Sequence, residues 1–154
     1  MLTKQEIAEI DEELKLVPLK SAACIEALKI IQSHRGWVSD ESISDLAAYL
    51  DMSSEELDNV ATFYNLIFRK PVGRHVILLC DSVSCYLLGY QKIRNHLEDI
   101  LGIKYGETTP DNRFTLLPIP CLGTCDHAPA MIIDDDLHKD LTAASIESIL
   151  EKYK

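Results

Sequence analysis

The sequence contains no apolar run long enough to cross a membrane. The longest one, Val76–Cys80, is far shorter than the roughly 20 residues that a spanning helix needs. Residues 1–14 carry acidic side chains and lack the apolar core of a secretory signal, and they do not resemble a transit peptide. We therefore expect a cytoplasmic protein, in a reducing compartment where stable disulfides are rare. Membrane association would then come only through a protein partner.

Basic side chains are scarce and are nowhere clustered. The chain has 15 Lys and Arg residues against 25 Asp and Glu residues, which gives a formal net charge of −10. Proteins that bind nucleic acids or anionic lipids neutralise phosphates with Lys and Arg. The composition therefore disfavours both a nucleic-acid partner and direct contact with an anionic membrane.

Nucleotide-binding motifs are also absent. No glycine-rich dinucleotide fingerprint follows a predicted strand, and the sequence holds no P-loop. We therefore expect that this chain binds no dinucleotide by itself. Any hydride chemistry would belong to a partner protein.

Cysteine is the residue type that points most directly to chemistry. Four of the five cysteines form two tight pairs, Cys80 with Cys85 and Cys121 with Cys125. The pairs leave 4 and 3 residues between partners, and 35 residues separate the two pairs. The fifth, Cys24, falls on the apolar side of a predicted helix, where a free cysteine packs as a small hydrophobic residue. We expect Cys24 to be a buried structural thiol.

The first half of the chain has the pattern of a small bundle of about four helices. Apolar residues recur at helical spacing in four segments between residues 7 and 64. Thr3 with Glu6 and Ser53 with Glu56 fit the capping box that begins a helix. Phe63 and Tyr64 are expected to pack inside this bundle, although an aromatic docking surface that includes Trp37 is the alternative.

The second half changes to strand periodicity after a break at residues 71–73. Strands are predicted at 75–80, 114–119 and 130–133, with a short fourth one within 137–141. Helices are predicted at 87–101 and from Thr142 to about residue 152. The order β-α-β-β-β-α predicts an α/β sandwich of thioredoxin type. Both cysteine pairs would then lie in loops at one edge of the sheet.

Three chemistries are open to four such thiols. Structural zinc usually takes pairs with two intervening residues, and no such pair is present, although thiolates accept either metal. A thioredoxin-like dithiol site needs the same short pair, and Cys121–Cys125 is one residue too long. A [2Fe–2S] cluster takes four thiolates, two per iron, and suits pairs of unequal length. The spacing therefore favours an iron–sulfur site over the other two.

The residues around the cysteines agree with that preference. Ser82, Ser84, Gly123 and Thr124 are small, so backbone amides can approach and hydrogen-bond the sulfur atoms of a cluster. A Rieske centre would need two pairs that contain histidine, and only His127 is present near either pair. We reject that centre and expect His127 to be an exposed loop residue.

Several segments of the sequence resemble one known protein family. Residues 111–115 and 121–129 resemble the signature of the small [2Fe–2S] subunit of respiratory NADH:quinone oxidoreductase, complex I, which in bacteria is the E subunit. Further segments are similar to the same family, namely 25–29, 35–38, 60–64, 71–75, 80–85 and 89–91. The resemblance covers nearly the whole chain, and several motifs in register make it specific.

The resemblance implies an α+β (α/β) chain of two domains. A small N-terminal helical bundle, residues 1–72, would precede a thioredoxin-like [2Fe–2S] domain, residues 73–154. Transfer of the family's ligands residue by residue assigns the [2Fe–2S] cluster to Cys80, Cys85, Cys121 and Cys125.

The resemblance also implies a place in a larger oxidoreductase. The partner would be a larger subunit that binds FMN and NADH, together with other subunits of the peripheral arm on the cytoplasmic side of the inner membrane. This chain would exchange single electrons with the partner's flavin and hold no catalytic residue. Similar subunits occur in NAD-linked hydrogenases and formate dehydrogenases, so the parent enzyme is open. A zinc-stabilised assembly module without electron transfer is the alternative of a different class.

Overall fold

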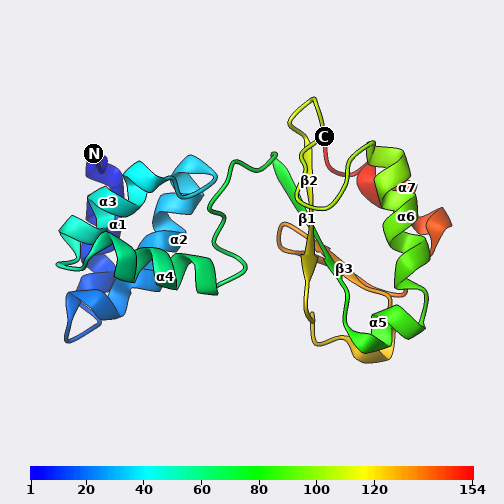
Figure 1. Ribbon diagram of the computed structural model, residues 1–154, viewed down its shortest axis with the longest axis horizontal. Coiled ribbons are helices and arrows are strands. Elements are labelled where there is room, and N and C mark those ends of the chain that lie inside the picture. The colour runs from blue at the N-terminus through cyan, green and yellow to red at the C-terminus, as the bar shows by residue number, and fades with distance from the viewer. The chain divides into compact units, whose positions relative to one another are not determined.

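The computed structural model describes all residues from 1 to 154. The chain separates into two compact units, Met1–Pro71 and Val72–Lys154 (Figure 1). None of the helices combines the length and the apolar character that a membrane-spanning helix requires.

The first unit is a bundle of four helices, coloured blue to green in Figure 1. The sequence predicted four helices here, and the capping boxes at Thr3 and Ser53 are both present. A short 3-10 turn, η1, precedes the second helix and was not predicted. The elements are α1 (Lys4–Leu14), η1 (Lys20–Ala23), α2 (Cys24–Arg35), α3 (Asp40–Tyr49) and α4 (Ser54–Phe63).

A buried ion pair links three helices of this bundle. Glu6 of α1 is only 1% exposed, and its carboxylate accepts two hydrogen bonds from the Arg35 guanidinium of α2, at 2.6 and 2.8 Å. Arg35 also donates to Ser42 Oγ of α3 at 3.0 Å. The arginine lowers the pKa of Glu6 to about 2. Cys24 is buried in the apolar core of the same unit, as the sequence predicted.

The prediction that Phe63 and Tyr64 pack inside the bundle is wrong. Phe63 is 80% exposed and Tyr64 is 42% exposed. The buried residues of α4 are Leu57 and Ala61, one helical turn apart. Phe63 lies two positions beyond Ala61 and so turns away from that face. Tyr64 has extended backbone angles and follows the last residue of the helix.

The second unit is built on a four-stranded sheet in the order β2-β1-β3-β4. β1 and β2 run parallel, whereas β3 is antiparallel to both β1 and β4. The strands are β1 (His75–Cys80), β2 (Phe114–Ile119), β3 (Met131–Ile133) and β4 (Asp136–His138). β1 and β2 have the predicted bounds, and the other two strands are shorter than predicted or shifted by one residue. The α+β class and the strand order along the chain are confirmed.

Three helices and one turn accompany the sheet. α6 and α7 lie side by side along it (Figure 1). The Thr142 hydroxyl caps α7, as predicted. The elements are α5 (Val83–Leu87), α6 (Tyr90–Leu101), the 3-10 turn η2 (Cys125–His127) and α7 (Ala143–Leu150).

The helix predicted over 87–101 begins three residues later, and a short helix that was not predicted precedes it. Gly89 has a φ of +110°, a left-handed conformation that a glycine adopts easily and that interrupts the helix. α5 therefore ends at Leu87, and α6 begins at Tyr90. Cys85 lies on α5 rather than in the open loop that the sequence predicted.

Candidate metal centre

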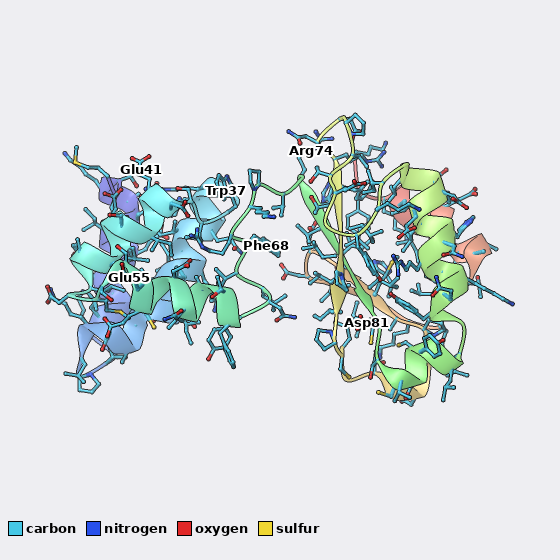
Figure 2. The ribbon with its side chains drawn as sticks, viewed as in Figure 1. Trp37, Glu41, Glu55, Phe68, Arg74 and Asp81 are labelled. Atoms are coloured by element: carbon cyan, nitrogen blue, oxygen red, sulfur yellow. The ribbon has the colours of Figure 1, made fainter.

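The parallel pair β1 and β2 brings both cysteine pairs to one edge of the sheet. Cys80 is the last residue of β1, and its amide donates to the Ala130 carbonyl at 3.1 Å. The Asp81 amide donates to the Ile119 carbonyl at the end of β2, also at 3.1 Å, so the two strand ends are tied together. Cys121 follows two residues later. Figure 2 shows Asp81 at this end of β1 and Arg74 at the opposite end.

The first pair is buried. Cys80 at the end of β1 and Cys85 on α5 are each 2% exposed. Burial, together with a hydrogen bond with Cys80, raises the pKa of the Cys85 thiol to about 11. Because metals bind the thiolate, a metal at this pair would have to displace the Cys85 proton.

The second pair is exposed and lies in a loop. Both Cys121 and Cys125 are exposed, and the Gly123 amide donates to Cys121 Sγ at 3.2 Å. That amide is the main cause of a lowered pKa at Cys121. Gly123 has a φ of +72°, in the left-handed region that glycine tolerates best. The loop therefore presents a backbone donor to a cysteine sulfur.

The thiols of the two pairs also interact with one another. The pKa of Cys121 is lowered further by hydrogen bonds with Cys125, Ser82 and Cys80. The pKa of Cys85 is influenced electrostatically by Cys80 and Cys125. The structure thus gathers all four sequence-predicted site residues at a single place in the second unit.

The donor set fits a cluster that is held by thiolates alone. Four cysteines in two pairs supply two sulfur ligands per iron, the ligand set of a [2Fe–2S] cluster. No group of three His, Cys, Asp or Glu side chains lies close enough together to hold a metal ion. The fit therefore rests on the chemistry of the four thiols and on the amide that already faces one of them.

His127 is the last residue of the turn η2, which begins at Cys125. Its side chain is 47% exposed, and its Nδ1 is 2.9 Å from Asp140 Oδ2. The predicted exposure of His127 is confirmed, although the residue lies in a 3-10 turn rather than in an irregular loop.

An exposed apolar surface accompanies the cysteines, and the sequence pattern did not reveal it. Four large side chains on and just after α5 are 59–76% exposed: Val83, Tyr86, Leu87 and Leu88. We call them the α5 surface. A run of leucines and a tyrosine indicates burial by default, so composition alone gave no sign of this exposure. The α5 helix also carries the buried ligand candidate Cys85.

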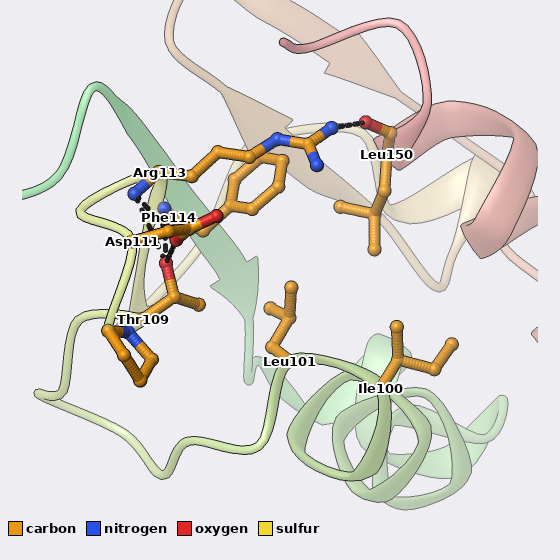
Figure 3. Close-up of a pocket in the computed structure, with 8 residues that line it drawn as sticks. Ile100, Leu101, Thr109, Asp111, Arg113, Phe114 and Leu150 are labelled. Atoms are coloured by element: carbon orange, nitrogen blue, oxygen red, sulfur yellow. Dashed lines mark hydrogen bonds between the residues drawn. The ribbon is translucent and has the colours of Figure 1, made fainter.

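A separate cavity of about 350 Å³ lies between β2, α6 and α7 (Figure 3). Its polar groups already bond within the protein. Asp111 Oδ1 accepts from Thr109 Oγ1 at 2.5 Å, and Arg113 Nη2 donates to the Leu150 carbonyl at 2.9 Å. The cavity contains no cysteine, and its arginine holds the end of α7.

Comparison with known proteins supports the same picture. Residues 10–154 match the model of the family described as thioredoxin-like [2Fe-2S] ferredoxin. A protein from Buchnera aphidicola, named as the E subunit of NADH-quinone oxidoreductase, is 52% identical over 153 residues, which are 99% of this chain and 94% of that one. The protein of the same name from Escherichia coli strain K12 is 51% identical, with 99% and 92% covered.

A solved structure resembles the chain as well. The crystal structure of NAD+-reducing [NiFe]-hydrogenase in the air-oxidized state matches with a TM-score of 0.73 and 27% identity. The match covers 85% of this chain but only 22% of that chain. The expectation of a thioredoxin-like fold is confirmed.

Proposed function

The chain belongs to the thioredoxin-like [2Fe-2S] ferredoxin family and, within it, to the family of NADH-quinone oxidoreductase E subunits. We propose that it is the iron–sulfur electron-transfer subunit of such an enzyme. In this proposal Cys80, Cys85, Cys121 and Cys125 bind one [2Fe–2S] cluster, which holds one electron at a time. The electron is exchanged with the flavin of an NADH-oxidising partner subunit.

The observation that carries the proposal is the convergence of four thiols at one sheet edge. Cys80 ends β1, Cys85 lies on α5, which follows β1, and Cys121 comes two residues after the end of β2, which pairs with β1. The second unit contains no other cysteine. A site with sulfur donors alone is what an iron–sulfur cluster requires of a protein.

The residues of this chain have separate tasks in the proposal. Cys80 and Cys85, buried on a strand end and a helix, fix the position of the site and keep water from it. Cys121 and Cys125 complete the ligand set from the exposed loop. The Gly123 amide offsets the negative charge on the Cys121 sulfur, which favours electron uptake.

The partner is proposed to approach at the edge where the exposed cysteines lie. Electron tunnelling weakens steeply with distance, so the flavin must come close to the site. The exposed loop and the α5 surface belong to this part of the second unit. Burial of large apolar side chains is a main source of affinity in stable subunit interfaces. We also propose that residues 1–72 and 73–154 are separate domains. The complex would hold the chain on the cytoplasmic side of the inner membrane.

A test of the electron exchange uses the chain together with its partner. The complex should be purified without oxygen through a tag on this chain and then reduced with NADH. We expect the absorbance and the EPR signal of a reduced [2Fe–2S] cluster to appear with the loss of oxidised flavin. The proposed exchange would be contradicted if NADH reduced the flavin but left the cluster oxidised at every NADH concentration, while dithionite reduced the same cluster readily.

The parent enzyme has a second candidate. The structural match to an NAD+-reducing [NiFe]-hydrogenase favours an NAD-linked hydrogenase as the alternative to a quinone reductase. The subunits that purify with this chain distinguish the two. Quinone-dependent NADH oxidation by the complex supports the first, whereas hydrogen-dependent NAD+ reduction supports the second.

A further inference from the structure

The hydroxyl group of Thr124 is buried and has no partner in the protein. Thr124 is 9% exposed, and its Oγ1 is the one hydroxyl oxygen among the buried side-chain atoms that lack a hydrogen bond. It lies in the short loop between Cys121 and Cys125. A buried polar group without a partner destabilises the folded state, and such groups in native proteins usually indicate a missing ligand, ion or water.

The backbone around Thr124 does not use this hydroxyl. Thr124 precedes the turn η2, the position from which a threonine side chain ordinarily caps a helix. Thr3 and Thr142 do cap their helices, each accepting from an amide at 3.2 Å. Thr124 makes no such bond, although its carbonyl accepts from the His127 amide at 3.0 Å. Capping therefore does not explain why a threonine occupies this position.

We infer that the Thr124 hydroxyl donates a hydrogen bond to a sulfur atom of the bound [2Fe–2S] cluster or of its ligand cysteines. This inference rests on the cluster site that we propose above. A threonine hydroxyl has one proton to donate, and sulfur atoms are the acceptors that the loaded site adds to this loop. The Gly123 amide already donates to Cys121 Sγ in the same loop. Thr124 is thus a second donor and a positioning residue that does not ligate iron.

The expected consequence is a change in the equilibrium between the oxidised and reduced states. Reduction adds one electron and makes the sulfur atoms more negative, while the proton stays on the Thr124 oxygen. A hydrogen bond to a more negative acceptor is stronger, so this donor favours the reduced state. Removing it should decrease the equilibrium constant for reduction on the order of tenfold, which is about 59 mV for a one-electron couple.

The test compares Thr124→Val, Thr124→Ser and the unchanged full-length chain. Each protein is purified without oxygen, its iron and sulfide are counted, and its midpoint potential is titrated. Resonance Raman spectra in H2O and D2O record whether an exchangeable proton bonds to sulfur. Thr115→Val is the matched control, because Thr115 is a buried threonine of the same unit whose hydroxyl bonds to Thr108 at 2.7 Å and accepts the Gly73 amide.

We expect Thr124→Val to have a more negative potential and smaller deuterium shifts of the Fe–S bands, whereas Thr124→Ser and Thr115→Val match the unchanged chain. A Thr124→Val protein with full iron and an unaltered potential and Raman spectrum would overturn the inference. If Thr124→Val cannot hold iron, Thr124→Ala replaces it, and equal potentials for the Ala and Ser variants would also overturn the inference. An unchanged chain without iron and sulfide would instead contradict the proposed function.

Discussion

The two cysteine pairs differ in how the fold holds them. Cys80 and Cys85 are buried on a strand end and on a helix, whereas Cys121 and Cys125 are exposed in a loop with one turn of 3-10 helix. The pKa shifts follow the same division, since that of Cys85 is raised and that of Cys121 is lowered. The core therefore fixes one pair, whereas solvent or a partner can reach the other.

Removing a thiol of the buried pair should abolish cluster binding. In Cys85→Ser a hydroxyl replaces a buried thiol, and a serine oxygen ionises far less readily than a thiol. We expect nearly complete loss of the cluster. The apoprotein should also lose about 1–3 kcal/mol of unfolding free energy, because the hydroxyl is buried. Iron and sulfide counts and urea unfolding of the apoprotein measure the two effects.

Cys24→Ser is the control for this variant, since Cys24 is also a buried free cysteine. It should lose a similar unfolding free energy and keep its iron. Iron retained in full by Cys85→Ser would show that the ligand set is wrong.

The exposed pair should separate cluster binding from stability. We expect Cys121→Ser to lose the cluster or to hold it only weakly. Because the side chain is exposed, the unfolding free energy of the apoprotein should change by no more than about 0.5 kcal/mol. The same counts and the same urea titration measure it. An apoprotein as unstable as Cys85→Ser would remove the distinction between the pairs.

The thiols of the apoprotein should differ in reactivity. The thiolate is the reacting form, so at pH 8 iodoacetamide should alkylate Cys121 at least roughly tenfold faster than Cys85. Mass spectrometry of the peptides against time measures both rates, and unfolding in urea should make them similar. Equal rates in the folded apoprotein would contradict the assigned environments.

The raised pKa of Cys85 predicts how the stability of the apoprotein depends on pH. Since the pKa of Cys85 is raised to about 11, its folded form binds a proton that the unfolded chain releases near pH 8.5. The neutral thiol therefore contributes stability that is complete below pH 8.5 and is lost as the pH rises through about 11. Urea unfolding of the apoprotein across this range should show a loss that Cys85→Ala lacks.

A charge on the α5 surface should weaken binding of the partner subunit. Leu87→Asp places a charge on the α5 surface at a side chain that is 76% exposed. We expect affinity for the flavin-bearing subunit to fall about tenfold or more, because a buried leucine contributes about 1.5–3 kcal/mol. Leu137→Asp, on β4 at 42% exposure, is the control and should bind normally. Titration calorimetry measures both, and equal affinities would contradict the proposed docking edge.

Much of the fold could be predicted from local pattern. β1 and β2 have the predicted bounds because both are short, predominantly apolar segments between turn residues. α5 was missed, since only its last residue, Leu87, falls within the helix predicted over 87–101 and the left-handed Gly89 separates α5 from α6. Phe63 was placed in the core because aromatic residues usually pack there, and its exposure depends on which face of α4 meets the bundle.

The site was predictable to a similar extent. Spacing and the family resemblance singled out the four cysteines, and the structure places them at one sheet edge. Their unequal burial was not predictable, because it depends on which residues of α5 face the sheet. That the buried Thr124 hydroxyl has no hydrogen-bond partner was also not predictable, since a sequence does not show hydrogen-bond partners.

The central claim is that the four paired cysteines bind a [2Fe–2S] cluster, and the metal content of the full-length protein tests it most directly. The chain should be purified without oxygen, analysed for iron, zinc and sulfide, reduced with dithionite and examined by EPR. We predict a red-brown protein with two irons and two sulfides per chain and the EPR signal of a reduced [2Fe–2S] cluster. A colourless protein with stoichiometric zinc and no sulfide would contradict the claim and support a zinc-stabilised assembly module.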